Sequence, residues 1–255
     1  MSRQIETDIS AYHVEILSAL KEIGNPSLAK HMPEDRRSLL MYCGVRVPDR
    51  RRRVNAGFSF TGKSDGKVLE IWDQLWRNSD NGDVMFCALD HYRDRVRKSV
   101  DANWWPVMRN WIHRVENWAH ADELSSIYCR FFAADIAALL PQIRAWIETD
   151  ELWIRRVGLV SSIRYTGKNS VFLDEATAFD LLRPALGDDR YYIQKALGWV
   201  LRELRKAYPQ KTVDYLLTHS ADIGSIAFSR AIEHMSKKDV RKMRESRTQA
   251  LNRSG

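Results

Sequence analysis

Hydrophobic positions along this chain recur at intervals of three and four residues, the spacing that gathers them on one face of an α-helix. Residues 9–23 show this spacing, and Gly24-Asn25-Pro26 carries the signals that end a helix. No segment shows the alternating pattern that is typical of a half-buried strand. The pattern predicts further helices over 47–56, 66–77, 83–97, 101–115, 119–139, 141–150, 151–165, 174–185, 189–207, 209–219, 224–235 and 237–251.

The predicted helices are joined by short loops and form pairs that recur about every 35–45 residues, the period of HEAT and armadillo repeats. A single irregular bundle is the alternative, but the regular pairing favours a stack of repeats. We therefore predict an all-α fold, an α-solenoid of HEAT-like helical repeats with a concave basic face. A single domain, 1–235, is followed by a basic C-terminal helix or tail, 236–255.

The composition supports a helical fold. The 255 residues include only 12 Gly and 7 Pro, too few for the many turns of an all-β sandwich. The hydrophobic share of 44% and the charged share of 29% are typical of a globular chain. Three widely spaced cysteines, Cys43, Cys87 and Cys129, predict free thiols rather than a disulfide framework or a zinc site.

The charge balance is basic, with 40 Lys and Arg against 33 Asp and Glu, a net charge of +7 and a pI near 9.4. This excess suits a nucleic-acid partner, and it equally suits solubility alone. No apolar run approaches the roughly 18 residues of a membrane helix. The acidic residues near the N-terminus do not fit a secretory signal, so we expect a cytoplasmic protein with no membrane partner.

Helix 189–207 presents two different faces. The apolar face consists of Ile193, Leu197, Val200 and Leu204. The opposite face consists of Lys195, Trp199, Arg202 and Lys206. Cations around an aromatic ring suit a phosphate backbone with a sugar or base against the indole. The alternative is that Trp199 packs against a neighbouring repeat and the cations are solvated.

A second candidate site lies within residues 116–125. Trp118 and Asp122 are four residues apart, so a helix places them on one face. If Trp118 precedes the helix, Asp122 lies in its first turn, where the helix dipole favours the ionised carboxylate. The alternative is an ordinary acid beside a core tryptophan. His120, between them, is a weaker candidate for a general base.

Two arginine groups complete the set. Arg156 projects into an apolar arc of helix 151–165, whereas Arg155 lies beside Gly158 and Ser162, where a backbone can approach closely. Arg155 is therefore the better phosphate ligand and Arg156 the better structural arginine. The run 50–53 contains four arginines that spread around a helix, so only one or two of them can face a ligand.

Four segments, in this order, resemble one known family. They are Tyr42-Cys-Gly-Val-Arg-Val-Pro48, Trp118-Ala-His-Ala-Asp122, Leu152-Trp-Ile-Arg-Arg156 and Ile193-Gln-Lys-Ala-Leu-Gly-Trp-Val-Leu-Arg202. The chain resembles the DNA alkylation repair family typified by AlkD, a HEAT-like-repeat DNA glycosylase, over most of its length. The resemblance implies excision of N3- and N7-alkylated purines, such as 3-methyladenine and 7-methylguanine, from duplex DNA.

The resemblance also implies roles for individual residues. Asp122 is expected to stabilise the oxocarbenium-like sugar and to position a water at C1′, while Trp118 and Trp199 hold the deoxyribose. The expected DNA-binding residues are Arg155, Arg156, Arg202, Lys195 and Arg46. We expect a monomer that needs no metal and no cofactor, and that associates with the nucleoid when bound to DNA.

The rival prediction is a non-catalytic HEAT-repeat module that binds damaged or branched DNA or an acidic protein, because fold alone does not fix function. Asp122 favours the enzyme. A carboxylate in a cationic groove repels phosphate, so a scaffold gains nothing from it.

Overall fold

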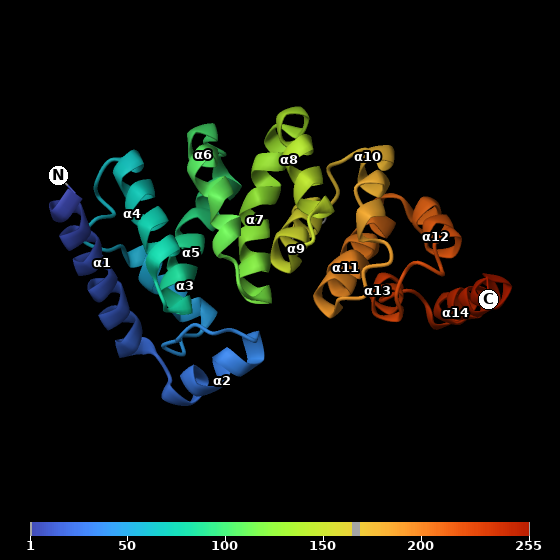
Figure 1. Cartoon of the computed structure of the whole chain (residues 1–255), viewed down its shortest axis with the longest axis horizontal. Coiled ribbons are helices and arrows are strands. Elements are labelled where there is room, and N and C mark those ends of the chain that lie inside the picture. Colours follow the sequence, from blue (N-terminus) through green and yellow to red (C-terminus); the bar gives the residue numbers. More distant parts are fainter. Residues whose placement is uncertain (1, 165–168, 255) are drawn as a thin grey trace. The chain divides into compact units, whose positions relative to one another are not determined.

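The computed structural model describes residues 2–164 and 169–254, and Figure 1 follows the chain through its helices. Within these ranges there is no β-strand, only an isolated bridge between Met41 and Asn81. The predicted all-α fold class is therefore confirmed. The contacts divide the chain into two compact units, Met1–Ile127 and Tyr128–Gly255, and each is described by itself. The single domain expected over 1–235 stays a prediction.

The first unit is built around helix α5, which packs against α1, α3 and α4. Its core contains two stacked indoles, Trp76 and Trp111, whose ring centroids are 5.5 Å apart. The Trp76 Nε1 donates to the backbone O of Trp111 at 3.0 Å. The elements are α1 Ser2–Ile23, α2 Pro26–Arg36, α3 Val47–Ala56, α4 Asp65–Asn78, α5 Gly82–Lys98, the 3₁₀ helix η1 Ala102–Trp104, α6 Trp105–Met108, the 3₁₀ helix η2 Arg109–Arg114, and the start of α7 Trp118–Ala134.

The second unit is built around helix α11, which packs against α9, α12 and α13. Gly198 allows the close approach of α11 and α13, because a Cβ added there would lie 2.5 Å from the backbone O of Ala227. After the end of α7, its elements are α8 Ile136–Glu148, α9 Leu152–Ser161, α10 Glu175–Asp180, the 3₁₀ helix η3 Arg183–Ala185, α11 Tyr191–Ala207, α12 Pro209–Thr218, α13 Ser225–Ala231 and α14 Lys237–Ser254.

The periodicity predicts most of these helices, and the bounds 47–56 agree with α3. Helix α2 was not predicted. Gly24-Asn25-Pro26 ends α1, but it also starts α2. Asn25 Oδ1 accepts a hydrogen bond from the backbone N–H of Leu28 at 3.1 Å, and Pro26 occupies the first helical position.

Three other boundaries differ from the prediction. The helix expected to begin at Pro141 begins earlier, because Asp135 caps α8 by accepting from the backbone N–H of Ala138 at 3.0 Å. The helix expected over 101–115 is a series of short 3₁₀ and α segments. The helix expected over 151–165 ends at Ser161, and Tyr165 lies outside the described residues.

Candidate active site

Helix α7 carries two of the predicted catalytic residues near its start. Asn117 caps the helix, because its Oδ1 accepts hydrogen bonds from the backbone N–H of Ala119 and His120 at 3.0 and 2.9 Å. Trp118 is the first helical residue, and Asp122 lies about one turn further along the same side. Asp122 would lie in the first turn only if Trp118 preceded the helix, and this condition is not met, because α7 begins at Trp118.

The two side chains differ in exposure. Trp118 is half-buried, and its Nε1 donates to the backbone O of Asp35 at 3.2 Å. Asp122 is only 7% exposed. A carboxylate that is sheltered from bulk water acts more strongly on a nearby charge than one in solvent. The start of α7 therefore presents an indole and a sheltered carboxylate one helical turn apart.

His120 is a structural residue, and the interpretation of it as a general base is wrong. Its ring is fully buried, with centroids 5.4 Å from Trp76 and 4.3 Å from Phe86. Its Nε2 lies 3.3 Å from the backbone O of Gly82, and Asn117 Nδ2 lies 3.0 Å from its Nδ1. These partners assign the proton to Nε2. Burial lowers the pKa of His120 to about 3, which keeps the ring neutral.

The loop before α3 is hydrogen-bonded to the start of α7, and its residues Ser38 and Leu39 were not singled out in the sequence. Ser38 Oγ donates to Glu116 Oε1 at 2.6 Å, and the backbone N–H of Leu39 donates to Glu116 Oε2 at 3.0 Å. Asn117 Nδ2 donates to the Tyr42 hydroxyl at 3.3 Å. These partners lie more than 70 positions apart in the chain, and no local pattern links them.

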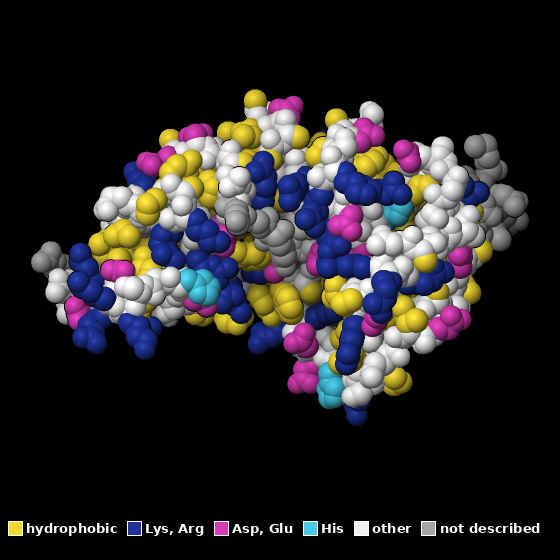
Figure 2. Space-filling model, turned by 180° about the vertical axis from the view of Figure 1, so that it is seen from behind, with side chains coloured by type: hydrophobic (Ala, Val, Ile, Leu, Met, Phe, Trp, Pro, Cys, Tyr) yellow, Lys and Arg dark blue, Asp and Glu magenta, His cyan; other side chains and the backbone are white. Residues whose placement is uncertain are grey.

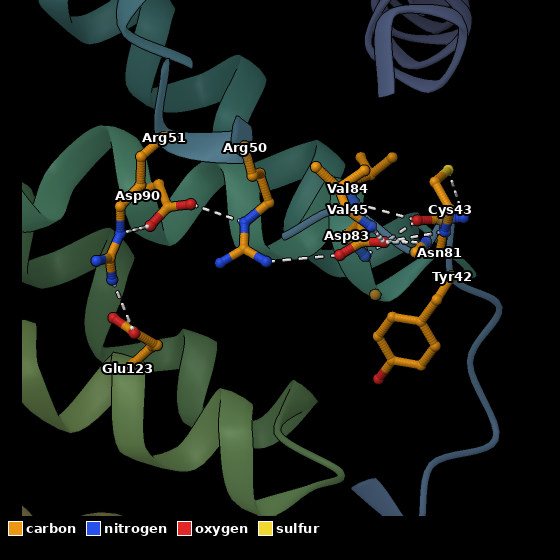
Figure 3. A network of polar contacts seen from close by, with 12 residues as sticks. Tyr42, Cys43, Val45, Arg50, Arg51, Asn81, Asp83, Val84, Asp90 and Glu123 are labelled. Atoms are coloured by element: carbon orange, nitrogen blue, oxygen red, sulfur yellow. Dashed lines mark hydrogen bonds and ion pairs between the residues drawn. The ribbon is translucent and has the colours of Figure 1, made fainter. Parts of the chain in front are cut away.

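The segment that follows Tyr42 is anchored on a buried acid, Asp83 (Figure 3). One carboxylate oxygen of Asp83 accepts from the backbone N–H of Cys43 at 2.9 Å and of Gly44 at 3.1 Å. Its other oxygen faces Arg50 Nη1 at 3.5 Å, and Arg50 Nε donates to Asp90 at 2.7 Å. Arg50 is only 1% exposed, so this arginine holds α3 against α5 and does not face a ligand.

The same network extends to the residue that follows Asp122 (Figure 3). Arg51 Nε donates to Asp90 at 3.0 Å, and Arg51 Nη2 donates to Glu123 Oε1 at 3.0 Å. Burial raises the pKa of Glu123, and the charge of Arg51 opposes this shift. The network fixes the rotation of α7 next to Asp122.

Arg46 stands apart from this network. It precedes the first residue of α3, and its side chain is exposed. It takes part in no side-chain hydrogen bond or ion pair among the residues that the structure describes. Its guanidinium is therefore available to an anion.

Arg155, in the second unit, is buried, and its assignment as the better phosphate ligand is wrong. Its guanidinium donates to the backbone O of Thr149 at 2.7 Å and to Asp188 Oδ2 at 2.7 Å. Burial raises the pKa of Asp188, but hydrogen bonds from Arg190 and Arg155 outweigh it and lower the pKa to about 2. The small residue Gly158 admits α8 and not a phosphate backbone, because an added Cβ would lie 3.1 Å from the backbone N of Ile147.

The contacts of Arg156 are those expected of a structural arginine. Its side chain is only 5% exposed, and its Nη1 donates to the backbone O of Tyr192 at 2.6 Å. Its guanidinium also lies over the Tyr192 ring, 5.9 Å from the centroid. These contacts join α9 to the start of α11.

Helix α11 has the two predicted faces. Its apolar side is buried, whereas Lys195 and Trp199 are half-buried. Lys195 Nζ lies 3.2 Å from the Tyr191 hydroxyl. Arg202 Nη1 donates to Glu233 Oε2 at 2.5 Å, so an acid already neutralises this cation.

The predicted site residues thus form two groups, one in each unit. The first unit holds Trp118, Asp122 and Arg46, and the second holds Arg155, Arg156, Lys195, Trp199 and Arg202. Figure 2 shows one face of the molecule, on which Lys and Arg side chains are spread among acidic ones. The described ranges contain no cluster of three or more His, Cys, Asp or Glu side chains placed to hold a metal ion. They also contain no helix that is long and apolar enough to span a membrane.

The family model described as DNA alkylation repair enzyme matches residues 16–235, and the chain belongs to this family. No curated protein matches the sequence.

Solved structures share the fold at low sequence identity. A predicted DNA alkylation repair enzyme from Enterococcus faecalis is 17% identical, with 84% of this chain and 97% of that chain covered and a TM-score of 0.67. AlkD2 from Streptococcus mutans is 17% identical, with 75% and 91% covered and a TM-score of 0.54. The smu.31 protein from Streptococcus mutans UA159 is 17% identical, with 74% and 93% covered and a TM-score of 0.53.

Proposed function

We propose that this protein is a DNA glycosylase that hydrolyses the N-glycosidic bond of N3- and N7-alkylated purines in duplex DNA. The observation that carries the proposal is the pair at the start of α7, Trp118 and Asp122, one turn apart with the carboxylate sheltered. Membership of a repair-enzyme family supports the substrate class.

The chemistry needs little from the protein beyond electrostatics and positioning. Alkylation at N3 or N7 makes the purine cationic, so the base leaves as a neutral molecule and no group has to protonate it. The charge that develops is on the sugar, which becomes oxocarbenium-like. Asp122 stabilises this charge and orients the water that attacks C1′. This route uses no metal and no cofactor.

Trp118 holds the sugar in this proposal. Its indole lies against the deoxyribose, where an aromatic face near a developing cation contributes on the order of 1 kcal/mol or more once desolvated. Trp199 lies in the second unit, and its contact with the deoxyribose stays a prediction. His120 takes no proton, because its ring is buried and neutral.

The basic residues divide into two roles. Arg46 and Lys195 contact phosphates. Arg202 contacts a phosphate only after its ion pair with Glu233 breaks. The free energy lost with this ion pair is modest, because Glu233 is 38% exposed to solvent. Arg155 and Arg156 orient α9 through backbone carbonyls and Asp188. We further propose a monomer that works in the cytoplasm, at the nucleoid when bound to DNA.

The test is release of free base from duplexes that carry a single 7-methylguanine or a single 3-methyladenine, followed by chromatography under single turnover. The proposal expects free alkylated base, with no release from an unmodified duplex. Tight, salt-sensitive binding without release from either lesion would contradict it and would favour a non-catalytic module. Branched DNA would then be the next ligand to test.

A further inference from the structure

Helix α14, Lys237–Ser254, lies outside the residues that the family model matches, which end at residue 235. Its sequence contains seven Lys and Arg against two acids, Asp239 and Glu245, which is a net charge of +5. The whole chain carries +7, so this one helix of 18 residues holds most of the positive excess. The proposed function uses none of its residues.

The start of α14 is set by a turn and a cap. The left-handed conformation of His234, with φ of 65°, turns the chain out of the preceding segment. Ser236 then caps α14, because its Oγ accepts from the backbone N–H of Asp239 at 3.1 Å and donates to the Asp239 carboxylate at 2.6 Å. The helix therefore leaves this turn in one direction, and Asp239 is engaged at its first turn.

The inner side of α14 packs against the second unit, where the helix contacts α12 (Figure 1). Met243 is only 5% exposed. The guanidinium carbon of Arg247 lies 4.5 Å from the centroid of the Phe228 ring, and Arg247 Nη2 donates to the backbone O of Ile223 at 2.5 Å. These contacts fix the rotation of the helix, so that its other side faces solvent.

The outward side of α14 carries cations in two rows. At about 100° per residue, Lys237, Arg241 and Arg244 fall within about 60° of one another, and Lys238 and Lys242 form a second row beside them. All five residues are exposed. The rise of about 1.5 Å per residue separates the cations of the first row by about 6 and 4.5 Å along the helix axis. One helix face thus presents a regular array of positive charge.

These five cations are available to a ligand. Among the residues that the structure describes, none of their side chains takes part in a hydrogen bond or an ion pair. This distinguishes them from Arg155 and Arg202, which acids already neutralise.

The nearby acids do not cancel this charge. Glu245 is exposed between the two rows, and it is one acid against five cations. Asp239 is hydrogen-bonded to Ser236 at the start of the helix. Asp214 of α12, which faces Lys242 across the groove between α12 and α14, accepts a hydrogen bond from Gln210 at 2.8 Å. The outward face of α14 therefore stays cationic.

The chemistry of this face suits a row of phosphates. Helix α14 contains no aromatic residue on which an unpaired base can stack. In its described part, Leu251 is the one large apolar side chain that is exposed, whereas a membrane-binding helix and a stable protein interface both need a wider apolar face. Cations without aromatic or apolar neighbours fit a duplex backbone, which carries one charge per about 1.7 Å of its axis.

We propose that the outward face of α14, with Lys237, Arg241 and Arg244 flanked by Lys238 and Lys242, is an additional surface that binds the backbone phosphates of duplex DNA with or without a lesion. The inference rests on the proposed function only in taking duplex DNA as the partner. Phosphate contacts carry no sequence information, so this surface adds affinity and not selectivity. It keeps the protein on undamaged duplex by contacts that allow sliding while a lesion is sought.

The first test is the salt dependence of binding to an unmodified duplex, measured by fluorescence anisotropy. The variant K237Q/R241Q/R244Q removes the first row and keeps polar side chains that favour a helix. The slope of log K against log salt should flatten by about 2–3, because each lost phosphate contact contributes about 0.9. The Kd at about 0.1 M salt should rise by about tenfold or more.

A matched control removes the same net charge from other parts of the surface. Lys67, Arg97 and Arg183 have side chains at least 39% exposed, and each forms an ion pair with an acid three residues away. K67Q/R97Q/R183Q should change the slope by less than about 0.5, because paired cations release few counterions on binding. Equal flattening in the two triple variants would show that DNA responds to total charge only, and would overturn the surface.

Two further variants guard against an effect of misfolding. K237R/R241K/R244K keeps the charges and should bind within about twofold of the wild type, because the phosphates respond to charge. R241Q alone should flatten the slope by about 0.9. Since the changed residues are exposed, all of these variants should keep the wild-type melting temperature.

The second test separates this surface from catalysis. With saturating protein under single turnover, K237Q/R241Q/R244Q should release 7-methylguanine within about twofold of the wild-type rate, and only the half-saturating protein concentration should rise. A slower release at saturation would show that α14 acts in the chemical step and would contradict a role in affinity alone.

The outcomes distinguish this inference from the proposed function. A slope that depends on the first row, without base release by any variant or by the wild type, would uphold the surface and overturn the glycosylase. Base release with an unchanged slope would overturn the surface alone. A loss of affinity that is larger on single-stranded DNA or on duplex RNA than on duplex DNA would contradict duplex DNA as the occupant.

Discussion

At the scale of single residues, the arginines show that residue type alone does not fix a role. Arg50 and Arg155 are buried and paired with Asp90 and Asp188, whereas Arg46 is exposed. The acids that neutralise the first two decide their role, and those acids are distant in the sequence. A count of cations therefore overstates how many of them can bind phosphate.

Arg46 and Arg155 give opposite expectations when each is changed to alanine. Arg46→Ala should flatten the dependence of log K on log salt by about 0.9, the value for one lost phosphate contact on duplex DNA, and leave stability unchanged. Arg155→Ala should lower the free energy of unfolding by about 1.5–3 kcal/mol, because Asp188 and the backbone O of Thr149 lose a charged hydrogen-bond donor, while Arg190 still pairs with Asp188.

Fluorescence anisotropy at several salt concentrations and urea unfolding check the two expectations. A flatter salt dependence in Arg155→Ala with unchanged stability would contradict the structural role of Arg155. An unchanged slope in Arg46→Ala would remove Arg46 from the DNA contacts.

At the scale of elements, the start of α7 is the best-held part of the candidate site. Asn117 caps it, His120 joins it to α5, and Arg51 reaches Glu123 from α3. Catalytic groups must keep their geometry to be effective, and neighbours that lock their orientation provide this. The position of Asp122 is therefore a property of α3, α5 and α7 together.

The buried His120 makes stability depend on pH. Its pKa is about 3 in the folded protein and about 6.5 when unfolded. Between about pH 6.5 and 3, His120 is therefore protonated in the unfolded protein and neutral in the folded protein. Its contribution to the free energy of unfolding is complete above about pH 6.5 and falls as the pH drops toward 3. His91, whose pKa burial also lowers to about 3, adds to this loss.

His120→Gln should reduce the slope of unfolding free energy against pH by up to about 1.4 kcal/mol per pH unit between pH 6 and 4. Urea unfolding at several pH values measures this slope. A uniform loss of stability is expected from repacking and does not affect the test. An unchanged slope in the variant would show that His120 is already charged in the folded protein.

The helices could be predicted from the sequence better than the side-chain contacts between them. Helical periodicity depends on local spacing, so the amphipathic helices and the two faces of α11 could be predicted. The Trp118 and Asp122 pair also follows from spacing. The partners of Arg155, Arg202 and Glu116 could not be predicted, because each depends on residues that the fold brings from other elements.

At the scale of the whole molecule, the family, the fold and the net charge of +7 agree on a DNA-repair protein. Acidic side chains are interspersed among the cations on the face shown in Figure 2. The proposed DNA binding then depends on a few exposed cations, such as Arg46, together with aromatic groups. The proposed catalysis depends on one carboxylate, Asp122.

The most direct measurement compares wild type, Asp122→Asn and Asp80→Asn for single-turnover release of 7-methylguanine, with duplex affinity measured in parallel. Asp80 is an exposed acid of the first unit and serves as the matched control. Removing a charge that stabilises the transition state should slow release by about 10²–10³-fold in Asp122→Asn, while its Kd stays within about threefold of wild type. Asp80→Asn should match the wild type. Equal losses of release and affinity in Asp122→Asn, or undiminished release, would contradict the catalytic role of this carboxylate.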